Sequence, residues 1–166
     1  MNFEVPAIRY LLKPGYLIMN NDPMTVYGVL GSGMFVAIWD RKRKYSGCCI
    51  YLYPIASKDN EMTVCFGNVA INHLIDMMVT EGSKAEDLKA YLIGGGNRHE
   101  GDMGDKNQEI ADKILCKRNI EIYTRDVGGK LGRKFAFDSH TGQNMTMKVH
   151  KIRNSDWYPY LVENDK

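Results

Sequence analysis

Short apolar runs bounded by turn residues dominate the first third of the chain. Runs of this length that are rich in Val, Ile, Phe and Tyr are typical of β-strands. The sequence Asn-Asn-Asp-Pro over residues 20–23 predicts a turn, and the charged stretch over residues 40–47 predicts a hairpin-type turn. The pattern predicts strands over residues 15–19, 24–30, 34–39 and 49–53.

The apolar positions change to a helical period in the middle of the chain. Apolar residues three and four positions apart line one face of a helix. This spacing predicts a helix over residues 68–80, and Gly82 is suited to end it. The predicted apolar face consists of Ile71, Leu74, Ile75 and Met78.

A second amphipathic stretch predicts a helix over residues 106–117. Asp105 is suited to cap its N-terminus, and Gln108, three positions later, completes a capping-box pattern. Lys117 and Arg118 lie where the negative end of the helix dipole favours cations. The predicted apolar stripe consists of Ile110, Ala111, Ile114 and Leu115.

Four further apolar runs predict strands over residues 90–93, 120–124, 133–138 and 145–149. Runs of strands separated by two helices are typical of α+β proteins or of a layered α/β sandwich. The 166 residues suit one domain with a sizeable core.

Composition and charge narrow the class of protein. The chain is 44% hydrophobic and 25% charged with a net charge of +2, which is ordinary for a globular protein and weak for a nucleic-acid-binding one. Charges at Glu4, Arg9 and Lys13 interrupt any early signal sequence. The longest uncharged stretch, residues 23–39, contains glycines and is too short to span a membrane. We therefore expect a cytoplasmic protein without direct membrane insertion.

Three glycine clusters resemble nucleotide-binding loops without matching them. Residues 28–33, 94–96 and 128–133 lack the helix and the Lys-Ser/Thr pair that phosphate binding requires. Glycines at turns are the favoured interpretation. The basic run over residues 41–44 is interpreted as a solvated hairpin tip, with contact to an acidic protein surface as the alternative.

Histidines and cysteines do not form a metal-binding pattern, and no cofactor is expected. His73, His99, His140 and His150 lack ligand spacing, and His73 is interpreted as a structural side chain beside the first helix's apolar face. The four cysteines are expected to be free thiols, because no C-x-x-C pair exists. Cys65 and Cys116 are interpreted as small core residues, and the aromatic segment 157–160 as folding back on the domain or anchoring a partner.

One run of residues carries a specific family resemblance. Residues 30–40, Leu-Gly-Ser-Gly-Met-Phe-Val-Ala-Ile-Trp-Asp, resemble the signature strand of CheD, the chemoreceptor glutamine deamidase of bacterial chemotaxis, which typically reads L-G-S-C-V. Further similar motifs follow in the same order, so the resemblance runs from about residue 12 to residue 150. They are Lys13-Pro14-Gly15, residues 46–54, residues 93–96, residues 103–107, residues 126–133 and Thr141-Gly142.

The resemblance implies a CheD-like layered sandwich of mixed β-sheets with two main helices. It also implies a single domain over residues 1–166, with a core over about 12–152 and a C-terminal extension over 153–166. The family hydrolyses a side-chain amide with a Cys nucleophile, a His base and a Thr that orients the His. In this chain those positions fall on Gly33, Ile50 and Tyr27, so none of the three groups is present. A catalytically inactive member is therefore expected.

The resemblance also implies partners. CheD proteins bind the helical cytoplasmic domains of chemoreceptors and the CheC phosphatase, which presents a receptor-like helix. A degenerate member that keeps this recognition is expected to use the face around Tyr27, Ser32, Gly33, Phe35 and Ile50.

Two alternatives remain open. The first is an active deamidase with a relocated nucleophile, Cys48 or Cys49. Alternation along a strand favours Cys48, because it shares the face of Ile50, and His73 or His99 would have to serve as its base. The second alternative is a domain recruited outside chemotaxis.

Overall fold

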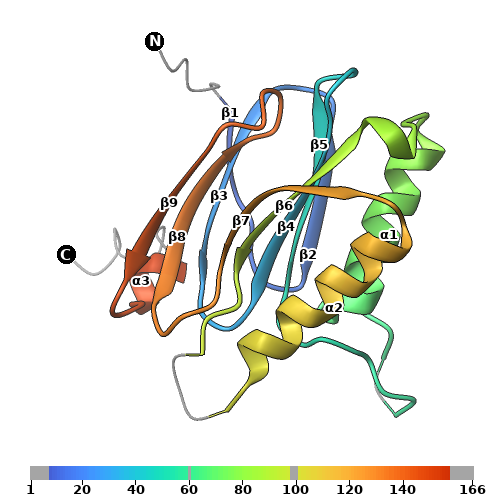
Figure 1. The fold of residues 1–166 in the computed structure, drawn as a ribbon. Coiled ribbons are helices and arrows are strands. Elements are labelled where there is room, and N and C mark those ends of the chain that lie inside the picture. The colour runs from blue at the N-terminus through green and yellow to red at the C-terminus, as the bar shows by residue number, and fades with distance from the viewer. Residues whose placement is uncertain (1–7, 60, 98–100, 158–166) are drawn as a thin grey trace.

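The computed structural model describes residues 8–59, 61–97 and 101–157, which form three layers (Figure 1). Helices α1 and α2 cover one face of a five-stranded sheet, and a four-stranded sheet covers the other face. The strand orders are β2-β5-β4-β6-β7 and β1-β3-β8-β9, each with one parallel pair. The expected α+β sandwich of mixed sheets is confirmed. Its elements are β1 (Ile8–Leu11), β2 (Tyr16–Asn20), β3 (Met24–Leu30), β4 (Met34–Asp40), β5 (Tyr45–Tyr51), α1 (Gly67–Thr80), the 3-10 turn η1 (Ala85–Asp87), β6 (Leu88–Gly94), α2 (Met103–Lys117), β7 (Glu121–Val127), β8 (Gly132–Asp138), β9 (Asn144–Val149) and α3 (Asn154–Trp157).

The middle strands are apolar throughout because both of their faces are buried. Along β4, Met34, Val36 and Ile38 face the helices, whereas Phe35 and Ala37 face the four-stranded sheet. A strand covered on both sides reads as a continuous hydrophobic run rather than an alternating one. The two resulting cores are separated by the backbone of the five-stranded sheet.

Helix α1 agrees with its prediction. Its buried side includes Ile71, Leu74, Ile75 and Met78, which pack on the five-stranded sheet. Gly82 has a φ of 104°, a conformation that suits glycine just beyond a helix end. His73 lies on the exposed side of the helix, so its interpretation as a structural side chain beside the apolar face is wrong.

Helix α2 begins three residues earlier than predicted. Asp102 is its N-cap residue and makes no side-chain capping bond, so the capping box of Asp105 and Gln108 is wrong. The side chain of Asn97 replaces it, because its Oδ1 accepts the N–H of Gly104 (2.9 Å) and its Nδ2 donates to Asp105 (2.8 Å). This cap comes from the preceding loop, and helical spacing alone does not reveal it.

The hairpin between β4 and β5 is tighter than the sequence predicts. β5 begins at Tyr45, four residues before the predicted start, and Lys44 closes the turn with a φ of 56°. The carboxylate of Asp40 accepts the N–H groups of Lys42 and Arg43, which stabilises a short turn.

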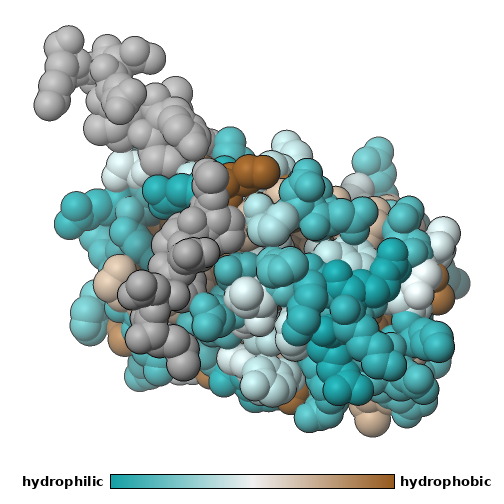
Figure 2. All heavy atoms as spheres, turned by 90° about the horizontal axis from the view of Figure 1, so that it is seen from above, coloured by the Kyte–Doolittle hydropathy of each residue, from teal (hydrophilic) through white to brown (hydrophobic). Residues whose placement is uncertain are grey.

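The charged turn is anchored to neighbouring elements. Arg41 and Lys42 form ion pairs with Asp87 (3.7 and 3.3 Å), and Arg43 donates to the carbonyl of Glu81 at the end of α1 (2.5 Å). The basic run over residues 41–44 therefore also connects the hairpin to Asp87 and to the end of α1. Seen from this end, the surface is mostly hydrophilic (Figure 2).

Strand β1 and helix α3 were not predicted. β1 is a short, exposed edge strand parallel to β3, and α3 is a single turn against the outer face of the four-stranded sheet (Figure 1). Elements this short carry too few residues for a periodic signal. Among the described residues, no helix combines the length and apolarity that a membrane crossing requires.

Candidate functional site

The three glycine clusters lie in three loops, which meet at one end of the sandwich. The N–H groups of Gly95 and Gly96 donate to the carbonyls of Gly33 (2.9 Å) and Gly31 (3.2 Å). The N–H of Gly128 donates to Gly94 (3.0 Å) and that of Asn97 to Gly129 (2.8 Å). Residues 31–33, 94–97 and 128–131 therefore form one hydrogen-bonded loop cluster.

Close backbone approach explains Gly94 of the loop cluster and Gly104 at the start of α2. A Cβ on Gly94 would collide with the carbonyl oxygen of Gly33, and Gly94 also has a φ of 116°. A Cβ on Gly104, at the start of α2, would collide with the carbonyls of Gly95 and Gly96. These glycines thus let the loop cluster pack against α2, and the positive φ of Gly94 agrees with its interpretation as a turn glycine.

Asn107 of α2 connects the loop cluster to the end of β5. Its side-chain amide donates to the carbonyls of Ser32 (2.9 Å) and Leu52 (2.9 Å). Its backbone carbonyl accepts a hydrogen bond from the hydroxyl of Tyr51 (2.5 Å). The residue is fully buried. The sequence offered one indication of this role, since Asn107 ends the CheD-like motif over residues 103–107.

An ion pair between the buried Arg133 and the partly exposed Asp126 holds the loop over residues 128–131. Arg133 is 1% exposed, and its Nε donates to Asp126 (3.1 Å) while one terminal nitrogen donates to the carbonyl of Gly128 (2.9 Å). A guanidinium with several acceptors fixes loop geometry more strongly than a single contact. Arg133 therefore ties the ends of β7 and β8 to the loop between them.

Gly33, in the loop before β4, and Ile50, on β5, are both inaccessible. Gly33 is buried, and a Cβ there would lie 2.9 Å from the carbonyl oxygen of Tyr51 and 3.2 Å from the side chain of Leu52. Ile50 and its strand partner Phe35 are fully buried in the core between the sheets. Phe35 and Ile50 therefore cannot belong to an exposed contact face, and this part of the expectation is wrong.

Tyr27 lies apart from these two positions. Gly28 faces the core between the sheets, since a Cβ there would meet the ring of Phe135, so the neighbouring Tyr27 faces outward. There Arg9 lies over the ring of Tyr27 at 5.1 Å. Ser32 is partly exposed at the loop cluster. The resemblance implied that a catalytic site forms at Tyr27, Gly33 and Ile50, and these three positions do not converge on one cavity.

The two adjacent cysteines are buried in different cores. Cys48 shares the face of Ile50, as strand alternation predicted, and Cys49 faces the helices. Burial raises the pKa of the Cys48 thiol well above its ordinary value, and the nearby Cys49 adds to the effect. Burial likewise raises the pKa of Cys49 to about 12. A thiol with a raised pKa holds little of the nucleophilic thiolate at neutral pH.

No histidine base is placed beside Cys48 in the described part of the chain. His73 lies on the solvent side of α1, on the opposite face of the five-stranded sheet from Cys48. His140 and His150 are exposed, and His99 lies outside the described residues. The described residues also hold no group of His, Cys, Asp and Glu arranged to bind a metal ion.

Thiol labelling of the native protein at pH 8 should separate the cysteines. Cys116 is exposed rather than a core residue as expected, and Cys65 is partly exposed, so both should react within minutes. Cys48 and Cys49 should stay unmodified until urea unfolds the chain, because burial keeps them protonated and inaccessible. Peptide mass mapping identifies the labelled sites. Rapid native labelling of Cys48 would contradict this description.

A cavity of about 630 Å³ opens at the same end of the fold as Gly33. Leu52 contributes to its wall and lies directly against Gly33. Its lining residues are Lys13, Pro14, Tyr16, Leu52, Asn154 and Trp157. Trp157 thus folds back on the domain as expected, whereas residues 158–160 lie outside the described part.

A second cavity of about 520 Å³ lies at the opposite end of the sandwich. Trp39, Tyr91 and Tyr123 line it together with the turn between β8 and β9. Tyr91 packs between Trp39 (6.4 Å between ring centroids) and Tyr123 (5.6 Å). The two tryptophans of the chain therefore lie in separate cavities.

Known proteins similar to this chain share one description. Residues 54–148 match the family described as CheD chemotactic sensory transduction. The chain is 36% identical over 135 residues to the probable chemoreceptor glutamine deamidase CheD of Sulfurimonas denitrificans, covering 78% of this chain and 86% of that protein. It is 28% identical over 142 residues to the protein of the same name from Trichlorobacter lovleyi, covering 82% and 88%. It is 29% identical over 161 residues to that of Laribacter hongkongensis, covering 92% and 77%.

Proposed function

Because the chain belongs to the CheD family of chemotaxis proteins, we propose that it is a non-catalytic member, which acts by binding rather than by deamidation. The partner is the cytoplasmic domain of a chemoreceptor, and the site of action is the cytoplasm. The names of its relatives refer to a chemoreceptor glutamine deamidase, which supports a chemoreceptor partner for this chain. A CheC-type phosphatase is the second partner to test.

The chemistry at position 33 carries this proposal. Glycine offers no nucleophile, and the isoleucine at position 50 cannot accept a proton. Members of a catalytic unit act together, so the loss of nucleophile and base removes most of the rate enhancement. The space is also closed, because Leu52 and the carbonyl of Tyr51 lie where a side chain at position 33 would begin.

The alternative is a deamidase that uses Cys48. Amide hydrolysis by a cysteine needs an accessible thiolate and a base within hydrogen-bonding reach. Burial and a raised pKa weigh against Cys48, and both features apply to Cys49 as well. These observations favour the binding protein over the relocated enzyme.

Binding is tested by size-exclusion chromatography of this protein with a purified chemoreceptor cytoplasmic fragment. We expect co-elution, with micromolar or tighter affinity when the mixture is titrated by calorimetry. A CheC-type phosphatase is run as the second candidate partner. If neither protein binds at concentrations of tens of micromolar, the proposed function is wrong.

Restoring the missing groups should not restore deamidation. In the triple variant Gly33→Cys, Ile50→His and Tyr27→Thr, the new Cys would press on the Tyr51 carbonyl and the new Thr would face away. The His would enter an apolar core without a partner, at a cost of about 2 kcal/mol. Intact-mass analysis of a receptor fragment should therefore detect no product, and urea unfolding should show a less stable protein. Substantial product would mean that the site remains intact apart from its side chains.

A further inference from the structure

The cavity at Trp157 is built from segments far apart in sequence. The connection between β1 and β2 supplies Lys13 and Pro14, and the first residue of β2 supplies Tyr16. The segment after β5 supplies Leu52, and α3 supplies Asn154 and Trp157. Its walls are largely apolar, because most of the lining is formed by Pro14, Tyr16, Leu52 and Trp157. A cavity of about 630 Å³ is large enough for a bulky side chain of a partner protein.

Helix α3 is held in place by one carboxylate. Asp156 accepts a hydrogen bond from the Lys134 ammonium on β8 (2.6 Å) and another from the backbone N–H of Arg153 (2.8 Å). The Lys134 bond, followed by the Arg153 bond, lowers the pKa of Asp156 below its ordinary value. The carboxylate therefore stays charged at neutral pH, and the wall formed by Trp157 is anchored to the sheet.

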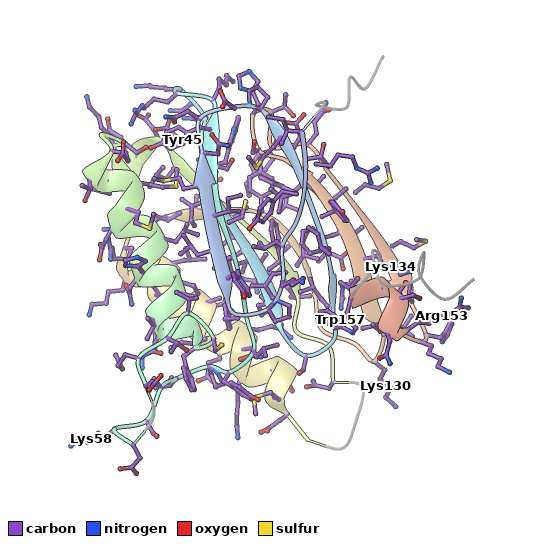
Figure 3. All side chains as sticks on the ribbon, turned by 180° about the vertical axis from the view of Figure 1, so that it is seen from behind. Tyr45, Lys58, Lys130, Lys134, Arg153 and Trp157 are labelled. Atoms are coloured by element: carbon purple, nitrogen blue, oxygen red, sulfur yellow. The ribbon has the colours of Figure 1, made fainter. Side chains whose placement is uncertain are left out.

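Basic side chains lie at the same end of the molecule as this cavity. Lys13 lines it, Lys134 anchors its α3 wall, and Figure 3 shows Arg153 and Lys130 at the same end of the molecule. The carboxylate of Asp156 is engaged by Lys134. Among the described residues at this end, Arg153 and Lys130 add positive charge near the cavity, which complements an acidic partner surface.

We propose that this cavity is the partner-binding pocket, and that it receives a large apolar side chain from an acidic segment of the partner, with Trp157 as the anchoring wall. The inference rests on the proposed function and names the site and chemistry of its interaction. Tryptophan is among the residues that most often dominate binding energy at protein interfaces. Basic residues near an apolar centre suit the usual arrangement of a polar rim around a desolvated core.

Intrinsic fluorescence reports on this pocket directly. In the variant Trp39→Phe, Trp157 is the remaining tryptophan, and its emission should shift when a chemoreceptor cytoplasmic fragment is added. In the reciprocal variant Trp157→Phe, the emission of Trp39 in the opposite cavity should stay unchanged. This second variant also supplies a readout if Trp39→Phe folds poorly.

Matched substitutions test the apolar anchor and the charge. Tyr16→Ala in the pocket is paired with Tyr123→Ala at the opposite end, since the two residues are similarly exposed (59% and 65%). Lys130→Glu, at the same end of the molecule as Trp157, is paired with Lys58→Glu, which lies far from Trp157 (Figure 3). Trp157→Ala should weaken binding at least tenfold, and Tyr16→Ala and Lys130→Glu at least threefold, whereas both controls stay within twofold.

The possible outcomes separate this inference from the proposed function. Binding that weakens in the pocket variants and decreases with salt, while the controls bind normally, supports the pocket. Binding that is unchanged in Trp157→Ala, Tyr16→Ala and Lys130→Glu overturns the pocket and leaves the proposed function standing. Absence of binding by the wild-type chain to both the receptor fragment and the CheC-type phosphatase overturns both.

Discussion

Replacing Asp126 by alanine should lower the free energy of unfolding by about 3 kcal/mol. The change leaves the Arg133 guanidinium, 1% exposed, without its charged partner. Removing the partner of a buried charge is costly because that charge is then poorly solvated. The estimate is at the low end of the usual range because the side chain of Asp126 is 34% exposed.

Urea unfolding followed by circular dichroism measures this effect. The matched control is Asp112→Ala, which removes the carboxylate of a second Arg–Asp pair, that of Arg125. Both members of that pair are exposed, so its loss should change stability by about 0.5 kcal/mol or less. Equal effects of the two substitutions would show that the Arg133 pair does not hold the loop cluster.

Replacing Asn107 by leucine should lower the free energy of unfolding by about 2 kcal/mol. The substitution removes two donors and leaves the carbonyls of Ser32 and Leu52 unpaired next to Gly33. Each unpaired carbonyl in a buried setting costs about 1–3 kcal/mol. Part of this loss is offset, because the buried Oδ1 of Asn107, which has no hydrogen-bond partner in the structure, is removed as well.

Hydrogen exchange distinguishes a local from a global effect of this substitution. The N–H of Gly95, which donates to Gly33, should exchange faster in Asn107→Leu, because the loop around Ser32 loses its support. Asn72→Leu is the control, since Asn72 is partly exposed on α1 and makes its bonds within the helix layer. Unchanged stability and unchanged exchange at Gly95 would contradict a supporting role for Asn107.

Periodicity in the sequence predicted the elements that bury a regular face. Helix α1 and strand β3 lie where the spacing of apolar residues placed them. The start of α2 was misplaced because its capping group is Asn97, which belongs to a different segment. The start of β5 was misplaced because Asp40 makes the preceding turn shorter than its charged composition suggested.

The candidate site was only partly predictable for a physical reason. Alternation along β5 correctly placed Cys48 on the face of Ile50. Whether that face is open depends on the four-stranded sheet, whose Phe135 packs on Phe35 at 4.2 Å between ring centroids. Those two residues are far apart in sequence, so local patterns could not show that the face is closed. The pocket at Trp157 likewise joins distant segments.

The central claim is that this CheD-family chain binds a chemoreceptor without deamidating it. The most direct test is intact-mass analysis of a chemoreceptor cytoplasmic fragment recovered from the fraction that co-elutes with the full chain. Deamidation of one glutamine adds about one dalton, because hydrolysis converts an amide into an acid. We predict co-elution with unchanged mass. A mass gain that Cys48→Ala abolishes and Cys116→Ala retains would contradict the claim and identify a relocated nucleophile.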